Sequence, residues 1–165
     1  MLFRSLNNMA MARKTFLDRF APNDRIHPIP TDVADPDESA QAYARELKTF
    51  YGADDLDSAR PLFDLVLMGV GPDGHTASLF PDYPALAENK RWVTGVPQAH
   101  VAPFVPRVTL TLPALASCHE MLFEVAGAEK RAILDRLSQD ESLPANRARS
   151  IGETVLLVDR AAVGG

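Results

Sequence analysis

The stretch Phe63–Pro81 reads FDLVLMGVGPDGHTASLFP, and the fold class can be argued from it. Its first six residues form a nearly unbroken apolar run, which is typical of a β-strand buried on both faces. Gly69, Gly71 and Gly74 then crowd a turn, because glycine reaches backbone angles that other residues avoid and leaves room beside the main chain. His75 follows this turn, at the carboxyl end of the predicted strand. Ligands bind at that end of the strands in open α/β sheets, so we expect the functional site here.

The glycines also satisfy the G-x-G-x-x-G pattern of dinucleotide-binding proteins. That pattern needs a helix of several turns after the third glycine, because the helix N-terminus binds the pyrophosphate. Pro81 and Pro84 would stop such a helix after about two turns. No strand with a ribose-binding acid follows at the required distance. We therefore expect no nucleotide cofactor.

Predicted strands and helices alternate along the chain, which favours an α/β fold with a mainly parallel sheet flanked by helices. A first helix ends near Phe20 and is predicted to bury one face, on which Phe16 and Phe20 lie. The other predicted helices cover 35–51, 128–137 and a short segment from Pro113. The predicted strands cover 25–29, 63–68, 92–96, 107–112, 120–125 and 154–158. We expect a single domain over residues 1–165.

Composition limits the classes of partner. The chain has 165 residues, of which 46% are hydrophobic and 24% charged, as in an ordinary globular domain. Its net charge of −5 argues against nucleic acid or an anionic membrane as a partner. Cys118 is the single cysteine, so an intramolecular disulfide is impossible and a reducing, cytoplasmic location is expected. The sequence has no apolar run of membrane-spanning length.

The segment Gly69–Pro81, GVGPDGHTASLFP, resembles the signature of the 6-phosphogluconolactonases. The related glucosamine-6-phosphate deaminases share a Gly-x-Asp-Gly-His core but continue with Ile-Ala-Phe-Asn-Glu-Pro, whereas Thr76–Pro81 is similar to the lactonase version. The resemblance implies a Rossmann-like, three-layer α/β fold. It also implies hydrolysis of 6-phospho-D-glucono-1,5-lactone to 6-phosphogluconate in the pentose phosphate pathway, without a cofactor.

The resemblance continues through RVTLTLP at 107–113, GAEK at 127–130 and VDRAA at 158–162, so the chain resembles the C-terminal two-thirds of the family fold. The family's earlier glycine-serine phosphate loop and its Gly-Asp-Glu-Arg segment are absent from this sequence, which is thus expected to be N-terminally truncated relative to the family. A parallel sheet cut in this way exposes a strand edge and apolar faces, so we expect the chain either to associate, with self-association through this edge as one form, or to be marginally stable. The alternative function is a non-catalytic sugar-phosphate-binding or interaction module.

Lactone hydrolysis needs a base for the attacking water, donors for the oxyanion and an anchor for the phosphate. His75 is the candidate base because imidazole titrates near neutral pH; the other interpretation is a histidine that braces a helix start. Asp73 either orients His75 or a water, or serves only as a turn residue. The backbone N–H groups around Gly71 and Gly74 are candidate donors to an oxyanion or a phosphate oxygen.

Lys130 follows Gly127 at a predicted helix start and is the leading phosphate anchor, against the alternative of a solvated lysine. Its position also resembles that of the lysine in the glycine-then-lysine turn of the 6-phosphogluconolactonases. Arg107 is a second candidate for the phosphate. His27, His100 and His119 are expected to be structural or exposed rather than catalytic. No metal-ligand cluster is evident in the sequence, so we expect a metal-free mechanism.

Overall fold

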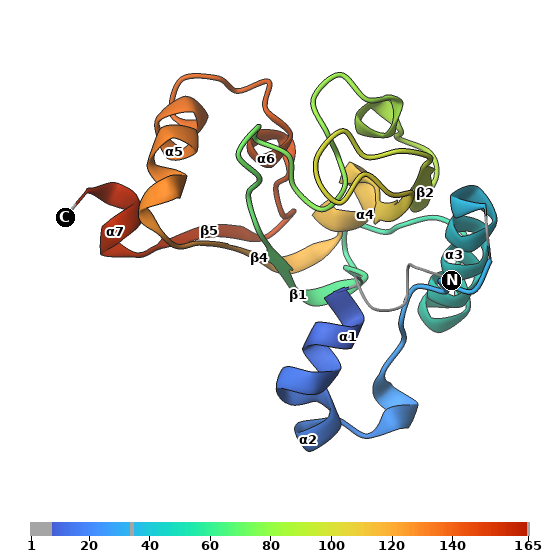
Figure 1. Cartoon of the computed structure of the whole chain (residues 1–165). Coiled ribbons are helices and arrows are strands. Elements are labelled where there is room, and N and C mark those ends of the chain that lie inside the picture. Colours follow the sequence, from blue (N-terminus) through green and yellow to red (C-terminus); the bar gives the residue numbers. More distant parts are fainter. Residues whose placement is uncertain (1–7, 34, 165) are drawn as a thin grey trace.

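A three-stranded parallel sheet, in the order β1-β4-β5, runs through the middle of the protein (Figure 1). The computed structural model describes residues 8–33 and 35–164. The strands of this sheet are β1 (Phe63–Met68), β4 (Cys118–Val125) and β5 (Glu153–Val158). A separate antiparallel pair consists of β2 (Val93–Val96) and β3 (Arg107–Leu110). The predicted α/β class, with a parallel sheet flanked by helices, is confirmed.

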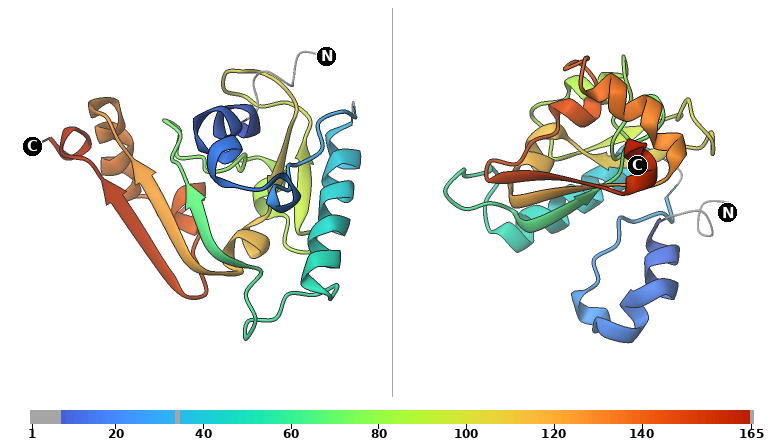
Figure 2. Two further views of the ribbon diagram at one scale, coloured as in Figure 1. Left: turned by 90° about the horizontal axis from the view of Figure 1, so that it is seen from below. Right: turned by 90° about the vertical axis from the view of Figure 1, so that its left-hand side faces the viewer.

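The helices lie on both sides of the main sheet, as two views at right angles show (Figures 1 and 2). In chain order they are α1 (Asn8–Ala12), α2 (Asp18–Phe20), α3 (Pro36–Tyr51), α4 (Leu112–Ala116), α5 (Arg131–Leu137), α6 (Pro144–Arg147) and α7 (Arg160–Val163). A π-helical turn at Arg13–Leu17 joins α1 to α2, and short 3-10 turns lie at Asn23–Arg25, Pro84–Ala87 and Ala128–Lys130.

Helix α3 begins and ends where its sequence predicts. The Asp35 carboxylate accepts a hydrogen bond from the N–H of Asp37 at 2.9 Å, which caps the helix start. Gly52 ends the helix in the left-handed conformation, with φ of 76°. Tyr51 packs edge-on against Trp92, with ring centroids 5.5 Å apart, so α3 and the β2–β3 pair share a small core. Phe50, the residue before Tyr51, points away from this core and is 80% exposed.

The main core lies on the face of the sheet covered by α5 and α6 (Figure 1). Val66 and Met68 of β1 point into it, and Phe123 of β4 pairs with Met68 in the parallel register. Phe80, fully buried, belongs to the same core. Because Phe80 follows the glycine-rich loop, its burial ties that loop to the end of β1.

The opposite face of the sheet is largely uncovered within the described part of the chain. Leu65 and Leu67 of β1 are 48% and 60% exposed, and Leu157 of β5 is 56% exposed. The prediction that the strand at 63–68 is buried on both faces is therefore wrong. Successive side chains alternate between the two faces of a strand, and α1 and α2 lie beneath β1 without covering the lower side of β4 and β5 (Figures 1 and 2).

Two further predictions near the N-terminus are corrected. A helical segment is present up to Phe20, but it buries none of its described residues, and Phe16 and Phe20 are 48% and 71% exposed. The predicted strand at 25–29 is absent, because Asn23–Arg25 forms a 3-10 turn and the following residues are irregular. Prolines on both sides of this segment favour extended backbone, but an extended segment is a strand only when it finds a partner.

Candidate functional site

The loop after β1 folds back on itself, and Gly71 lies where backbone hydrogen bonds cross the loop. The N–H of Gly71 donates to the carbonyl of His75 at 2.8 Å, and the N–H of Gly74 donates to the carbonyl of Gly71 at 3.0 Å. Gly74 has φ of 87°, which suits glycine. A Cβ on Gly71 would lie 2.1 Å from the imidazole ring of His75, so only glycine allows the ring to lie against the backbone here.

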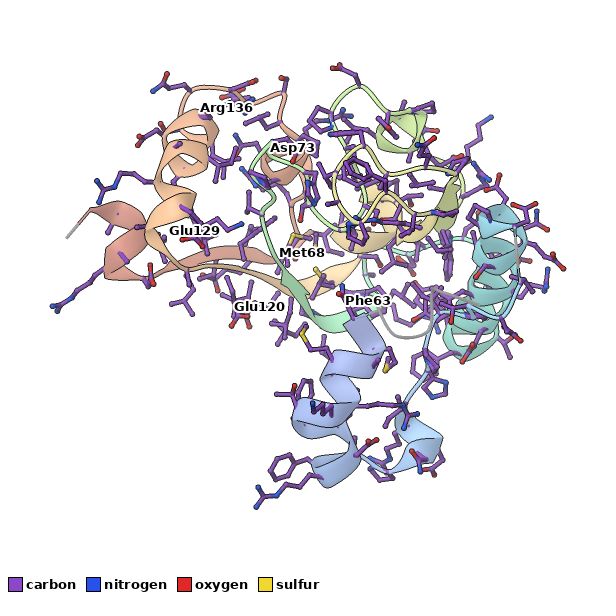
Figure 3. All side chains as sticks on the ribbon, in the orientation of Figure 1. Phe63, Met68, Asp73, Glu120, Glu129 and Arg136 are labelled. Carbon is purple, nitrogen blue, oxygen red and sulfur yellow. The ribbon has the colours of Figure 1, made fainter. Side chains whose placement is uncertain are left out.

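Asp73 lies at the tip of this loop, above the carboxyl end of β1 (Figure 3). Each of its two carboxylate oxygens contacts a histidine. His75 Nδ1 lies 2.5 Å from Asp73 Oδ1, and His100 Nε2 lies 2.8 Å from Asp73 Oδ2. The N–H of His75 also donates to Asp73 Oδ1 at 3.2 Å. The side chains of His75, Asp73 and His100 are 15%, 26% and 37% exposed, so the cluster is partly buried but reachable from solvent.

The hydrogen bonds of Asp73 define its charge. Burial acts to raise the pKa of this carboxyl, but the bonds from His75 and His100 outweigh it, and the pKa is lowered. Asp73 is therefore ionised at neutral pH and can only accept hydrogen bonds. Both imidazole nitrogens that face it must then carry protons. A neutral His75 consequently bears its proton on Nδ1 and has its basic lone pair on Nε2.

Phe80 joins the histidine cluster to Arg107. Its ring centroid lies 4.7 Å from that of His75 and 4.7 Å from that of His100. The guanidinium carbon of Arg107, at the start of β3, lies 5.6 Å from the same ring centroid. Arg107 also donates to the carbonyl of Pro103 at 3.2 Å. Burial lowers the pKa of Arg107 but leaves the guanidinium charged, so it is a cation beside the cluster.

Lys130 reaches the same loop from the 3-10 turn Ala128–Lys130, which follows the neighbouring strand β4. Its Nζ donates to the carbonyl of Val70 at 2.7 Å, although the two residues are 60 positions apart. The contact follows from topology, because β1 and β4 are adjacent and parallel and their carboxyl ends meet at one edge of the sheet. The turn before Lys130 is held by Asp159, whose two carboxylate oxygens accept from the N–H of Gly127 at 3.1 Å each.

The structure thus brings Asp73, Gly71 and Gly74 around His75, and Lys130 to the loop beside them. Sequence reasoning missed His100, which was expected to be merely structural or exposed. It comes from the irregular segment 97–106, and no local pattern there signals a contact with Asp73. Only the folded structure, in which this segment lies beside Asp73, identifies His100.

Metal ligands do not extend this site. Within the two described ranges, no group of three or more His, Cys, Asp and Glu side chains could hold a metal ion. Cavities of about 310 and 350 Å³ lie elsewhere in the described part of the chain, and His75 lines neither of these two. The candidate site is formed by the loop after β1 and its neighbours, and its three clustered side chains are 15% to 37% exposed. No described helix is long and apolar enough to cross a membrane.

Comparison with known proteins identifies the family. The family profile described as glucosamine-6-phosphate isomerases/6-phosphogluconolactonase matches residues 4–157. A 6-phosphogluconolactonase of Synechocystis sp. is 40% identical over 94% of this chain and 65% of its own length. One from Bos taurus is 39% identical over 76% of this chain and 48% of its own length. The chain belongs to the glucosamine-6-phosphate isomerase/6-phosphogluconolactonase family, as its signature predicts.

A solved structure agrees with this assignment. The crystal structure of 6-phosphogluconolactonase from Thermotoga maritima superposes with a TM-score of 0.68 at 33% identity, covering 83% of this chain and 57% of that one. The chain therefore spans less than two-thirds of the length of these relatives.

Proposed function

We propose that this chain hydrolyses 6-phospho-D-glucono-1,5-lactone to 6-phosphogluconate, the step of the oxidative pentose phosphate pathway for which its relatives are named. The observation that carries the proposal is the 2.5 Å contact of His75 Nδ1 with the ionised Asp73, which leaves His75 Nε2 as a base. Such a pair suits an acyl transfer to water, in which the base must have a defined tautomer.

In the proposed reaction, His75 Nε2 takes a proton from a water as its oxygen attacks the lactone carbonyl carbon. The tetrahedral intermediate then collapses, the bond from that carbon to the ring oxygen breaks, and His75 returns the proton to the departing ring oxygen. Asp73 stabilises the imidazolium that forms between the two steps. No cofactor or metal enters this scheme.

The phosphate of the substrate is assigned to Lys130, with Arg107 as a second cation. Both side chains donate to backbone carbonyls of loops next to His75, Lys130 to Val70 and Arg107 to Pro103. A phosphate oxygen accepts a charge-assisted hydrogen bond and would compete well with a neutral carbonyl for such donors. The substrate thus gains its anchor close to the base.

Gly71 and Gly74 are assigned to contact the sugar through their side-chain-free backbone. Their N–H groups both donate within the loop, and the N–H of His75 donates to Asp73. These N–H groups would therefore receive an oxyanion only if the loop opened.

The experiment measures hydrolysis of freshly prepared 6-phosphogluconolactone above its spontaneous rate. His75→Ala should lower kcat by roughly 10²–10⁴. Lys130→Ala should instead raise KM by about 10- to 150-fold with kcat nearer normal, because it removes one charge-assisted bond from both ground and transition states. If wild type and His75→Ala hydrolyse the lactone at the same rate, the proposal fails. Ammonia release from glucosamine 6-phosphate would favour the deaminase branch instead.

We also propose that a second copy of this chain covers the exposed edge of the sheet. Within the described residues β1 pairs with β4 alone, and Leu65 and Leu67 are exposed on it. An unpaired strand edge that carries apolar side chains is a template for another strand. Two-fold antiparallel pairing of β1 with its copy would put these leucines side by side.

For partner and location, the acidic net charge argues against nucleic acid as the ligand. A small sugar phosphate needs only local cations, and Lys130 and Arg107 supply these beside His75. The single cysteine, Cys118, is a buried free thiol. A free thiol suits a reducing compartment, which supports a cytoplasmic location.

A further inference from the structure

Asp73 has two imidazole partners, and the proposed hydrolysis uses only one of them. His75 bonds to Oδ1, and His100 bonds to the opposite oxygen, Oδ2, at 2.8 Å. His100 lies 27 positions further along the chain, in a segment without regular structure. A loop that only connected two strands would not have to place an imidazole against a partly buried carboxylate. The contact therefore points to a further role for His100.

We propose that His100 is a positioning residue, which holds the Asp73 carboxylate in the orientation that keeps the His75 proton on Nδ1. A carboxylate with both oxygens bonded cannot turn about its Cβ–Cγ bond without breaking a hydrogen bond. Without His100, Oδ2 is open to water, and only the contacts of Oδ1 with the N–H and Nδ1 of His75 hold the carboxylate. The carboxylate then turns more easily, and the preference of the His75 proton for Nδ1 over Nε2 weakens. His75 would then often present a protonated Nε2, which cannot act as a base.

Packing shows that His100 has a defined place. Its ring centroid lies 4.7 Å from that of the fully buried Phe80 and 5.1 Å from that of Tyr83. Phe80 also contacts the His75 ring, so one aromatic side chain fixes the distance between the two imidazoles. The charged groups facing this cluster are Asp73 from the loop after β1 and Arg107 from the start of β3.

His27 offers a contrast and a control. Its Nδ1 lies 2.7 Å from a carboxylate oxygen of Glu46, but the two side chains are 56% and 42% exposed. It therefore has the same type of histidine–carboxylate pair on the open surface and in another part of the chain. Removing His27 tests whether losing any such pair has the effect that we assign to His100.

The test compares three variants of the full chain: His100→Ala, His100→Gln and His27→Ala. Gln can donate an amide N–H to Asp73 Oδ2 but carries no ring and does not titrate. The first readout is the tautomer of His75, from long-range proton–nitrogen NMR correlations of the free protein at neutral pH. The second is the split between kcat and KM for the lactone. A thermal melt of each variant identifies any that fails to fold.

We expect His75 to be the Nδ1–H tautomer in wild type, His100→Gln and His27→Ala, and a mixture of tautomers in His100→Ala. We expect kcat to fall about 10-fold in His100→Ala with KM unchanged, and Gln to restore most of it. A His75 that keeps the wild-type tautomer in His100→Ala overturns the inference, as does a Gln variant as impaired as Ala. Only the kinetic readout rests on the proposed function: a wild type without lactonase activity refutes that function, while the tautomers still decide the role of His100.

Discussion

At the scale of single residues, the candidate site depends most directly on Gly71. The His75 ring lies where a side chain at this position would be, with a Cβ only 2.1 Å from ring atoms. We predict that Gly71→Ala displaces the imidazole and lowers kcat by roughly 10²-fold, as a misplacement of about 1 Å can do. Steady-state lactone hydrolysis measures the change.

Gly69 provides the matched control for this prediction. A Cβ at Gly69 meets nothing within 4 Å, although the residue lies in the same loop. Gly69→Ala should therefore keep near wild-type kinetics. If both alanine variants lost activity equally, a general demand of the loop for glycine would explain the result, and the specific contact with His75 would not.

Asp73 allows a prediction of how stability changes with pH. Its pKa is lowered in the folded protein: burial opposes ionisation, and the stronger effect of the histidine hydrogen bonds favours it. A lowered folded pKa stabilises the fold above the unfolded pKa, near pH 4, and this contribution is lost as pH falls through the folded value. We predict that wild type exceeds Asp73→Asn in urea stability at pH 7 and that the difference shrinks below about pH 4.

A constant difference between wild type and Asp73→Asn from pH 7 to pH 3 would show that the charge of Asp73 does not stabilise the fold. The urea midpoint and slope should be fitted together at each pH. A change in slope would indicate altered compactness and not a change in this electrostatic contribution.

At the scale of elements, Asp159 connects α7 to the turn that carries Lys130. Its carboxylate caps α7 by accepting from the N–H of Ala162 at 2.8 Å, and it also accepts from the N–H of Gly127. We predict that Asp159→Ala lowers the free energy of unfolding by about 1 kcal/mol, as expected for loss of a cap. It should also raise KM, because the turn before Lys130 loosens. Chemical denaturation and lactone kinetics measure the two effects.

Asp35→Ala is the corresponding control, because Asp35 caps α3, which packs against β2 and not against the turn of Lys130. A similar loss of stability with unchanged KM is expected there. Should Asp35→Ala raise KM as much as Asp159→Ala, the effect would reflect general destabilisation, and the link from Asp159 to the phosphate site would be lost.

At the scale of the whole molecule, the uncovered face of the sheet leads to a prediction about association. Leu67, on the free edge strand β1, is 60% exposed. We predict that the wild-type chain is a dimer and that Leu67→Lys is a monomer, because two-fold pairing would place the introduced charges close together. Sedimentation velocity at several concentrations measures the state.

Phe50→Lys is a fair comparison, since Phe50 is 80% exposed on α3, which packs against the β2–β3 pair. It should remain dimeric. A wild-type chain that is monomeric at every concentration and melts sharply would remove the argument for association, because the open face would then be compatible with a stable single copy.

Much of the molecule could be predicted from local patterns. The apolar run at 63–68 forms the expected strand, and the helix predicted over 35–51 forms with nearly the same bounds. The prediction of a strand at 25–29 is wrong because an extended segment becomes a strand only when it pairs with another strand. The residues of the segment itself do not show whether such a partner is present. The two faces of β1 could not be told apart, because leucine, valine and methionine are apolar on both.

For the site, the sequence by itself determined that His75 follows a glycine-rich turn with Asp73 two residues before it, since backbone geometry alone keeps such neighbours close. Only the tertiary structure decided that Lys130 contacts Val70 and that His100 contacts Asp73. These contacts depend on which strands are adjacent and on how the segment 97–106 packs over Phe80. Such arrangements arise from burial summed over residues far apart in the chain, and no short stretch of sequence contains that information.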